Sequence, residues 1–253
     1  MRGFGFHMLS GSLLAVLFAI TSLSGGCTGA QCPLGLIGQT ALFDGKDLAG
    51  WKGLGERENT WAVAAKVAID PADDKKFVIT PGTGILVNGP TGRTCDLVTE
   101  RQFGDCQLHI EFVVPKGSNS GAYLQGNYEI QILDSYGKPD VTYSDCGAIY
   151  PRWIDNKNIE GHAPRVNASK PPGEWQSFDI TFRAARFDAS GKKIENARFV
   201  KVLQNGQVIH ENVELNAPTR GSMDTEDVAR GPLRLQGDHG PVAYRNIRIR
   251  PLD

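Results

Sequence analysis

Two carboxylic acids stand close together in a segment that has the pattern of a polar-faced strand. In a strand that begins at Tyr128, Glu129 and Gln131 share one face, and the apolar residues of the segment share the other. Strict alternation places Asp134 on the apolar face, but one bulged residue before it would return it to the face of Glu129. Two carboxyl groups beside one cleft can serve as a general acid and a general base.

The spacing of Glu129 and Asp134 is similar to that in the catalytic strand of laminarinase-type glucanases, where paired acids act on a glycosidic bond. Gln131 departs from that pattern, which normally has a third carboxylate between the two acids. The alternative interpretation is a solvated strand face that ends in an Asp turn. These six residues do not decide between the two.

The elements that must position these residues are short strands. Alternation of apolar and polar residues, separated by Gly-rich and Asn-Gly turns, predicts an all-β fold. Asn205-Gly206 predicts a hairpin, Gly126-Asn127 a turn, and residues 119–121 first a turn and second a substrate loop. No segment shows three turns of helical periodicity. We therefore expect a two-sheet antiparallel jelly-roll sandwich, with a concave sheet available for a ligand. The predicted strands are residues 76–79, 84–87, 97–99, 108–114, 128–133, 177–182, 199–203, 207–209 and 242–249.

Composition and charge exclude several classes of protein. The chain has 253 residues, and 27 Lys and Arg against 28 Asp and Glu leave a formal charge of -1. No global field recruits nucleic acid or an anionic membrane surface, so a nucleic-acid binder is disfavoured. Hydrophobic residues at 40% and charged residues at 22% indicate a folded globular protein rather than a disordered one.

The first 27 residues have the pattern of an export signal. Arg2 precedes an apolar stretch over residues 9–23, which is too short and too interrupted for a spanning helix. The sequence LSGGC ending at Cys27 resembles a bacterial lipobox, in which the cysteine is lipidated. We expect an exported protein of the bacterial envelope or periplasm, joined to the membrane only through this anchor; plain secretion is the alternative. The predicted organisation is a signal over 1–27, a tether over 28–39 and one domain over 40–253.

Four cysteines remain after Cys27, and in an oxidising compartment they could form two disulfides with three possible connectivities. The four are Cys32, Cys95, Cys106 and Cys146, and Cys95 and Cys106 flank two extended runs, which is compatible with a cross-strand bridge between them. No pair has CxxC spacing, so a structural zinc or redox site is disfavoured. The spacing does not assign the connectivity.

Sequence blocks along most of the chain resemble the 3-keto-disaccharide hydrolase family. The resemblance spans about residues 41–252. The blocks are 42–51 (LFDGKDLAGW), 61–63 (WAV), 103–105 (FGD), 108–112 (LHIEF), 119–121 (NSG), 123–125 (YLQ), 128–135 (YEIQILDS), 147–150 (GAIY), 173–176 (GEWQ), 205–206 (NG), 231–240 (GPLRLQGDHG) and 244–249 (YRNIRI).

This resemblance implies a concanavalin A-like jelly roll that acts on sugars already oxidised at C3, as a hydrolase or as a paired 1,2-lyase and hydratase. A ketone at C3 acidifies the C2 proton, so a general base can remove it and the enolate can expel the C1 substituent. Such a route needs a base near C2, an electrophile at the C3 oxygen and an acid near the glycosidic oxygen. Two carboxylates, a His and a divalent metal would supply these groups.

With that chemistry, Glu129 is the leading base or metal ligand and Asp134 its partner acid. Glu111 is a third candidate: it shares a strand face with His109, and a neighbouring antiparallel strand could carry Glu129. His239 lies in a Gly-rich turn, from which imidazole can transfer protons or bind a metal. The alternatives are an edge-strand charge for Glu111 and a hydrogen-bond anchor for His239.

Amide and aromatic side chains are the candidates for binding a carbohydrate substrate. Amides suit sugar hydroxyls but could equally satisfy backbone groups, and aromatic rings could stack on sugars but are more often core. The candidates are Gln125, Gln131, Gln236, Tyr123 and Tyr150, with Trp153 as a further stacking residue and Arg152 as a group that could polarise the ketone.

The sequence does not decide whether the protein binds a metal ion, and it allows more than one function. It contains no Asp-rich calcium loop and no His-x-x-x-His pair, so residues of distant strands would have to hold any metal. It does not identify protein partners. Two functions compete with cleavage of 3-keto-glycosides: a non-catalytic carbohydrate-binding module, and an ordinary endoglucanase.

Overall fold

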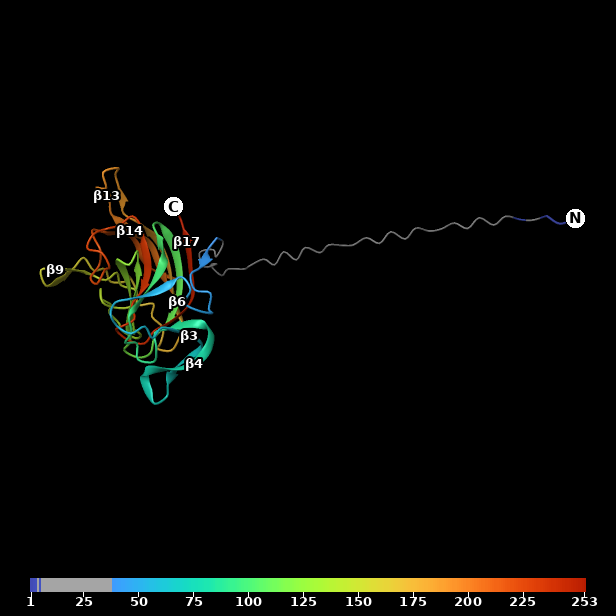
Figure 1. Cartoon of the computed structure of the whole chain (residues 1–253), viewed down its shortest axis with the longest axis horizontal. Coiled ribbons are helices and arrows are strands. Elements are labelled where there is room, and N and C mark those ends of the chain that lie inside the picture. Colours follow the sequence, from blue (N-terminus) through green and yellow to red (C-terminus); the bar gives the residue numbers. More distant parts are fainter. Residues whose placement is uncertain (4, 6–37) are drawn as a thin grey trace. The chain divides into compact units, whose positions relative to one another are not determined.

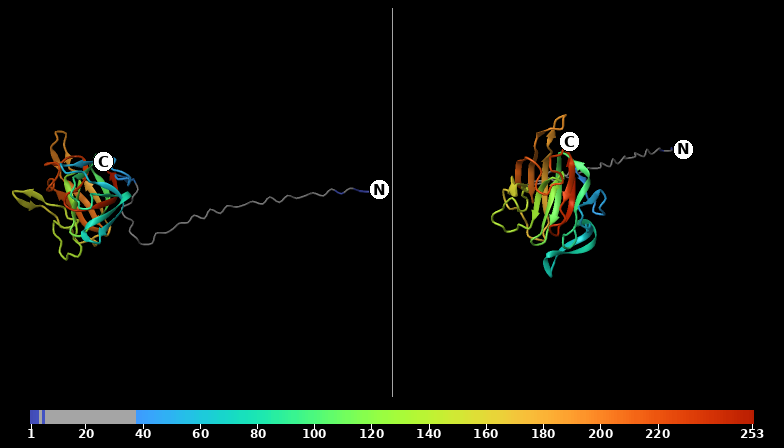
Figure 2. Two further views of the ribbon diagram at one scale, coloured as in Figure 1. Left: turned by 60° about the horizontal axis from the view of Figure 1, so that its bottom comes forward. Right: turned by 60° about the vertical axis from the view of Figure 1, so that its left-hand side comes forward.

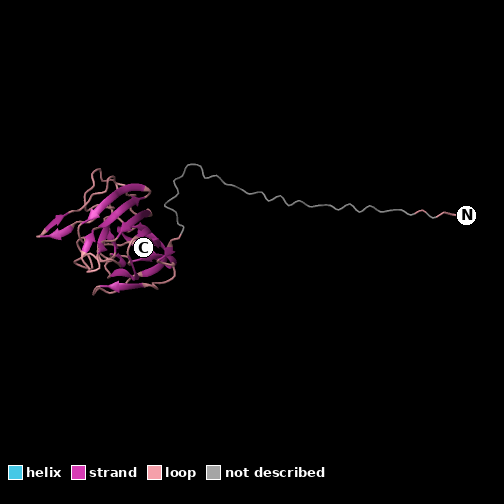
Figure 3. Ribbon diagram, turned by 90° about the horizontal axis from the view of Figure 1, so that it is seen from above, coloured by secondary structure: helices cyan, strands magenta, loops and turns pink. Residues whose placement is uncertain are grey.

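The computed structural model describes residues 1–3, 5 and 38–253, and its strands all belong to one compact unit. Every regular element in this described part is a β-strand (Figure 3), so it contains no helix that could cross a membrane. Apart from residues 1–3 and 5, the predicted export signal lies outside the described residues, as do Cys27 and Cys32. The fold is an antiparallel jelly-roll sandwich of two large sheets, as the alternation predicts.

The larger sheet has the strand order β15-β14-β11-β6-β17-β4-β3, and β1 pairs with β17. In this sheet β3 and β4 form a long hairpin at one end (Figure 1). Its strands are β1 (Thr40–Ala41), β3 (Ala62–Asp70), β4 (Asp73–Val87), β6 (Cys106–Val113), β11 (Gln176–Arg183), β14 (Ala197–Gln204), β15 (Gln207–Leu215) and β17 (Ala243–Pro251).

The smaller sheet has the order β2-β5-β16-β7-β8 and carries the candidate site. Beyond β8, the backbone of residues 147–150 pairs with Glu129 and Gln131 and extends this sheet by a short irregular edge. Its strands are β2 (Trp51–Leu54), β5 (Asp96–Phe103), β7 (Asn119–Leu124), β8 (Tyr128–Leu133) and β16 (Gly231–Leu235).

Two short hairpins lie outside the sheets: β9 (Arg152–Ile154) with β10 (Lys157–Ile159), and β12 (Arg186–Phe187) with β13 (Lys193–Glu195). Both project from the body of the sandwich, the first in yellow-green and the second in orange (Figure 2). The β9–β10 hairpin turns on Asp155 and Asn156, whose positive φ angles of 49° and 60° fit a tight two-residue connection.

The core lies between the two large sheets. Tyr128 of β8 packs on Phe182 of β11 with 5.4 Å between ring centres, which joins the smaller sheet to the larger. Ile130 and Ile132 are fully buried in the same cluster. The alternation predicted for this strand is therefore confirmed: its even positions form core, and Glu129 and Gln131 point to the other face.

Most strand predictions agree with the structure, and one turn prediction does not. The Asn205-Gly206 hairpin joins β14 to β15, with φ angles of 51° and 80°. Residues 119–121, predicted as a turn, instead open β7, where Asn119 pairs with Leu133 of β8. The turn-forming tendency of these residue types is overridden there by pairing with β8.

The described cysteines form no disulfide. Cys95, Cys106 and Cys146 are buried free thiols. Cys95 precedes β5 and Cys106 follows it, so the whole length of that strand separates the two sulfur atoms. A bridge between Cys95 and Cys106, which the sequence left open, is therefore ruled out by the extended strand.

Candidate active site on the smaller sheet

Four residues lie in a row across the smaller sheet. Arg234 of β16 is directly opposite Tyr123 of β7, and Tyr123 is directly opposite Glu129 of β8. At the edge, the N–H of Tyr150 donates to the carbonyl oxygen of Glu129 at 3.1 Å. Directly paired residues of an antiparallel sheet project from the same face, so this row forms one wall of a site.

A cavity of about 260 Å³ lies over this row. This volume is near the lower end of small-molecule pockets, which suits one sugar ring. The lining is mostly polar and aromatic: Asn119, Tyr123, Glu129, Gln131, Tyr150, Arg220, Gly221, Gln236 and His239. Six of these residues were predicted as site residues, so the structure brings most of the candidates together.

Glu129 is the buried acid of the cavity. Its side chain is 2% exposed, and burial raises the pKa of its carboxyl to about 8, although a hydrogen bond from Tyr123 and the charge of Arg234 lower it. At neutral pH the group is a neutral carboxylic acid that can give up a proton. Gly121 leaves room for it, because a Cβ there would lie 2.2 Å from a Glu129 carboxyl oxygen.

Arg234 holds Tyr123 in place. Its Nε and Nη2 atoms each lie 2.6 Å from Oδ2 of Asp96, and Nη1 donates to the carbonyl oxygen of Gly221 at 2.6 Å. The guanidinium carbon lies 4.4 Å from the centre of the Tyr123 ring. Burial raises the pKa of Tyr123 well above its usual range, so its hydroxyl stays protonated and donates to Glu129.

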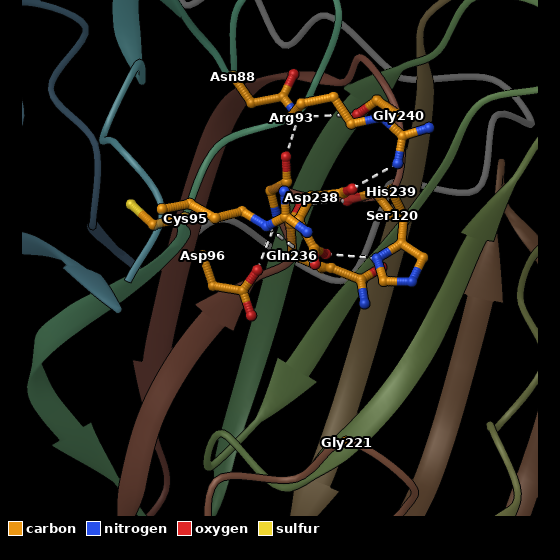
Figure 4. A network of polar contacts seen from close by, with 12 residues as sticks. Asn88, Arg93, Cys95, Asp96, Ser120, Gly221, Gln236, Asp238, His239 and Gly240 are labelled. Carbon is orange, nitrogen blue, oxygen red and sulfur yellow. Dashed lines mark hydrogen bonds and ion pairs between the residues drawn. The ribbon is translucent and has the colours of Figure 1, made fainter. Parts of the chain in front are cut away.

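His239 lies on the loop after β16, and buried hydrogen bonds fix this loop (Figure 4). The side-chain amide of Asn88 donates to the carbonyl oxygens of Gly237 at 3.1 Å and Gly240 at 2.8 Å, and its oxygen accepts from the N–H of Val242 at 2.8 Å. The loop is therefore a rigid support for an otherwise exposed imidazole.

Asp238 orients the imidazole of His239. Its carboxylate contacts Nδ1 of His239, and its carbonyl oxygen accepts a 2.9 Å hydrogen bond from Arg93 (Figure 4). Among the described residues, Nε2 of His239 has no hydrogen-bond partner. A carboxylate on one ring nitrogen and an unoccupied second nitrogen is the arrangement of an oriented general base.

Arg220 completes the cavity from a loop that the sequence did not single out. Thr219 ties this loop to the smaller sheet, because its N–H and its hydroxyl both donate to the carbonyl oxygen of Asn127, at 2.9 and 3.0 Å. Arg220 itself donates its backbone N–H to Pro151 at 2.8 Å. A guanidinium in the wall can attract an oxyanion that forms during a reaction.

Asp134 does not join Glu129, which corrects the prediction of a carboxylate pair. The pairing of β7 with β8 runs without a bulge to Leu133, so nothing returns Asp134 to the polar face. Its carboxylate instead accepts from the N–H of Gly117 at 2.9 Å, outside the cavity. Asp134 stabilises the turn before β7.

Glu111 also lies elsewhere. It does share a face with His109, as predicted, but this face belongs to β6 of the larger sheet, and β6 pairs with β11 and β17 rather than with β8. Glu111 binds Arg245 at 2.6 Å and Asn246 at 2.7 Å. Its carboxylate is part of a polar network on that sheet and not of the cavity.

Gln125 is structural as well. It is 3% exposed in the turn between β7 and β8, and its amide nitrogen donates to the carbonyl oxygens of Phe103 at 3.3 Å and Ala229 at 3.1 Å. It satisfies backbone groups, which was the alternative interpretation of this residue, and it does not line the cavity.

Metal ligands are sparse at the cavity. Within the described part of the chain, no three His, Cys, Asp or Glu side chains are grouped so as to hold a metal ion. Glu129 and His239 are the lining residues of these types. A divalent metal stays a prediction from the sequence.

The sandwich and its site define a class of protein. Rings, amides and one acid on a β-sheet face form the kind of surface on which carbohydrate-active jelly rolls bind sugars. Residues 38–250 match the model of the 3-keto-alpha-glucoside-1,2-lyase-like domain family, and the chain belongs to this family.

Known relatives agree with this assignment. The chain is 26% identical to a 3-keto-disaccharide hydrolase of Bacteroides thetaiotaomicron, over 88% of this chain and 81% of the relative. It is 30% identical to a candidate glycosyl hydrolase of Parabacteroides distasonis, with a TM-score of 0.62 over 85% and 84% of the two chains. A second such protein of that organism, 20% identical with a TM-score of 0.55 over 85% and 94%, shares the fold. Family and relatives support a hydrolase or lyase of glycosidic bonds.

Proposed function

We propose that the chain cleaves glycosides whose sugar carries a ketone at C3, with the cavity around Glu129 as the active site. The observation that supports this proposal is that one cavity contains two proton-transfer groups. Glu129 is a buried, neutral acid, and His239 is an imidazole that Asp238 orients. A reaction that removes one proton and delivers another needs these two groups.

The proposed reaction begins with loss of the C2 proton. Nε2 of His239 takes this proton, and the C2–H electron pair forms an enolate whose charge rests on the C3 oxygen. Arg220 lines the same cavity, and its guanidinium would stabilise that oxyanion. Asp238 would stabilise the imidazolium that forms on His239.

The second step expels the leaving group. As the C3 ketone re-forms, the electron pair forms a C1–C2 double bond and the C1–O bond breaks. Glu129 gives its proton to the departing oxygen, and Tyr123 and Arg234 stabilise the carboxylate that remains. Water then adds across the double bond, so elimination and hydration together give the products of hydrolysis.

The amides of the cavity would hold the sugar. Oδ1 of Asn119 is buried and has no hydrogen-bond partner among the described residues, so it can accept from a sugar hydroxyl. Gln236 lines the cavity, and its backbone N–H donates to the carbonyl oxygen of Gly121 at 2.9 Å. Tyr150 offers a ring on the same wall.

The test is release of the leaving group from a 3-keto-disaccharide and from its unoxidised parent, with and without a chelator. Release from the keto substrate alone supports the proposal, and loss of release with chelator adds a metal to it. Release from the parent supports an ordinary glycanase, and binding without release supports a carbohydrate-binding module. Transient accumulation of the C1–C2 unsaturated ketone, followed by its ultraviolet absorbance, distinguishes elimination from direct hydrolysis.

We also propose that the protein is exported and anchored in the cell envelope through Cys27. The apolar stretch at residues 9–23 and the LSGGC sequence support this location. Cys27→Ser should move the protein from the membrane fraction to the soluble fraction. Equal membrane association of the two forms would contradict a lipid anchor.

A further inference from the structure

A second cavity adjoins the active-site cavity. It has a volume of about 330 Å³, and it shares Arg220 and Gly221 with the cavity around Glu129. Its other walls are Arg152, Trp153 and Ile154 of β9 and, from the loop before β16, residues 217–219, 222 and 225. We name it the outer cavity. Arg220 and Gly221 therefore lie between the two cavities.

Trp153 is an exposed aromatic residue in a fixed position. Its side chain is 45% exposed, and the guanidinium carbon of Arg220 lies 4.0 Å from its ring centre. The hairpin that carries it is held by an ion pair of 2.8 Å between Arg152 and Glu160. Arg220 covers one face of this indole, so a ligand ring can stack on the other face.

The active-site cavity is too small to hold the leaving group as well as the keto sugar. Its volume of about 260 Å³ suits the keto sugar, so the second ring of a disaccharide must lie beyond it. The outer cavity is the neighbour that shares two wall residues. A third cavity is smaller, at about 210 Å³, and shares only Tyr150 with the active-site cavity.

We infer that the outer cavity binds the leaving group, and that a sugar ring of this group stacks on Trp153. The inference rests on the proposed function, because it assigns the second half of that substrate. It makes Trp153 a specificity-determining residue. The projecting β9–β10 hairpin (Figure 1) then selects glycosides with a second sugar over glycosides with a small alcohol.

The experiment compares two 3-keto-glucosides of the same anomeric configuration, a 3-keto-disaccharide and methyl 3-keto-glucoside. Trp153→Ala should lower kcat/KM for the disaccharide about tenfold, mainly by raising KM. It should change kcat/KM for the methyl glucoside less than about twofold. Trp153→Phe should restore most of the loss. Tyr136→Ala is the control, because Tyr136 is 55% exposed and lines neither cavity.

A second variant tests the cavity without removing the ring. Thr225→Trp should fill the outer cavity and give the same loss on the disaccharide alone. Equal losses on both substrates, or no loss on either, would overturn the inference and leave the proposed function intact. Failure of the wild-type protein to cleave either substrate would instead remove the proposed function, and the inference with it.

Discussion

Tyr123 and Glu129 are directly paired across β7 and β8, and the phenol hydroxyl hydrogen-bonds the buried carboxyl of Glu129. Burial raises the pKa of both groups, so both keep their protons at neutral pH. Arg234 packs on the Tyr123 ring from the next strand. In the proposed reaction this pair donates the proton, and His239 with Asp238 accepts the other.

Glu129→Gln should lower turnover of a 3-keto-glycoside by about 10²–10⁴-fold and leave binding within a few-fold, because the amide keeps the shape but cannot deliver a proton. Sugar release and calorimetric titration measure the two effects. Asp134→Asn is the matched control, since Asp134 caps the Gly117 turn outside the cavity, and it should retain full turnover. Unchanged turnover of Glu129→Gln would remove this residue from the mechanism.

The pH dependence should report the protonated state of Glu129. We expect kcat/KM to fall above about pH 8, where the carboxyl loses its proton. The hydrogen bond from Tyr123 lowers the pKa of Glu129, so Tyr123→Phe should raise that pKa and move the alkaline limb to higher pH. A shift of this limb to lower pH would contradict the assignment.

Stability should depend on the same proton. The pKa of Glu129 is about 8 in the folded chain against 4.5 for an ordinary Glu, so the folded state holds a proton that the unfolded state releases between these values. The free energy of unfolding therefore falls as pH rises through this window. The unfolding free energy of Glu129→Gln should not show this decline. The Tm of the variant minus that of wild type should therefore be greater at pH 9 than at pH 4. A Tm difference that is constant with pH would argue against a buried neutral acid.

Local pattern was sufficient to place Glu129 and insufficient to place Asp134. Alternation along β8 fixes which side chains face the core, and this information is contained in six consecutive residues. Whether a bulge precedes Asp134 depends on how β7 pairs with β8, and the pairing is regular. Glu111 was misplaced for a related reason: alternation gives a residue's face but not the sheet to which its strand belongs.

The missed residues act through contacts between distant parts of the chain. Arg234 and Asp96 are 138 residues apart in sequence and meet because β16 pairs with β5. Arg220 stands in a loop with no strand or helix pattern. The glycine-rich block at residues 231–240 did point to His239 and Gln236, but it carried no indication that Arg234 would support Tyr123.

Gly121 offers the last test, because its missing side chain makes room for the acid. A Cβ at this position would lie 2.2 Å from a carboxyl oxygen of Glu129 and 2.9 Å from its carboxyl carbon. Gly121→Ala should therefore displace the carboxyl from Tyr123, reduce kcat at least tenfold and cost about 1–3 kcal/mol of unfolding free energy. Gly206→Ala is the control: φ of 80° makes alanine unfavourable in the β14–β15 turn, so stability should fall while kcat stays unchanged. A Gly121→Ala protein with full kcat would mean that the position of Glu129 in the cavity does not matter for the reaction.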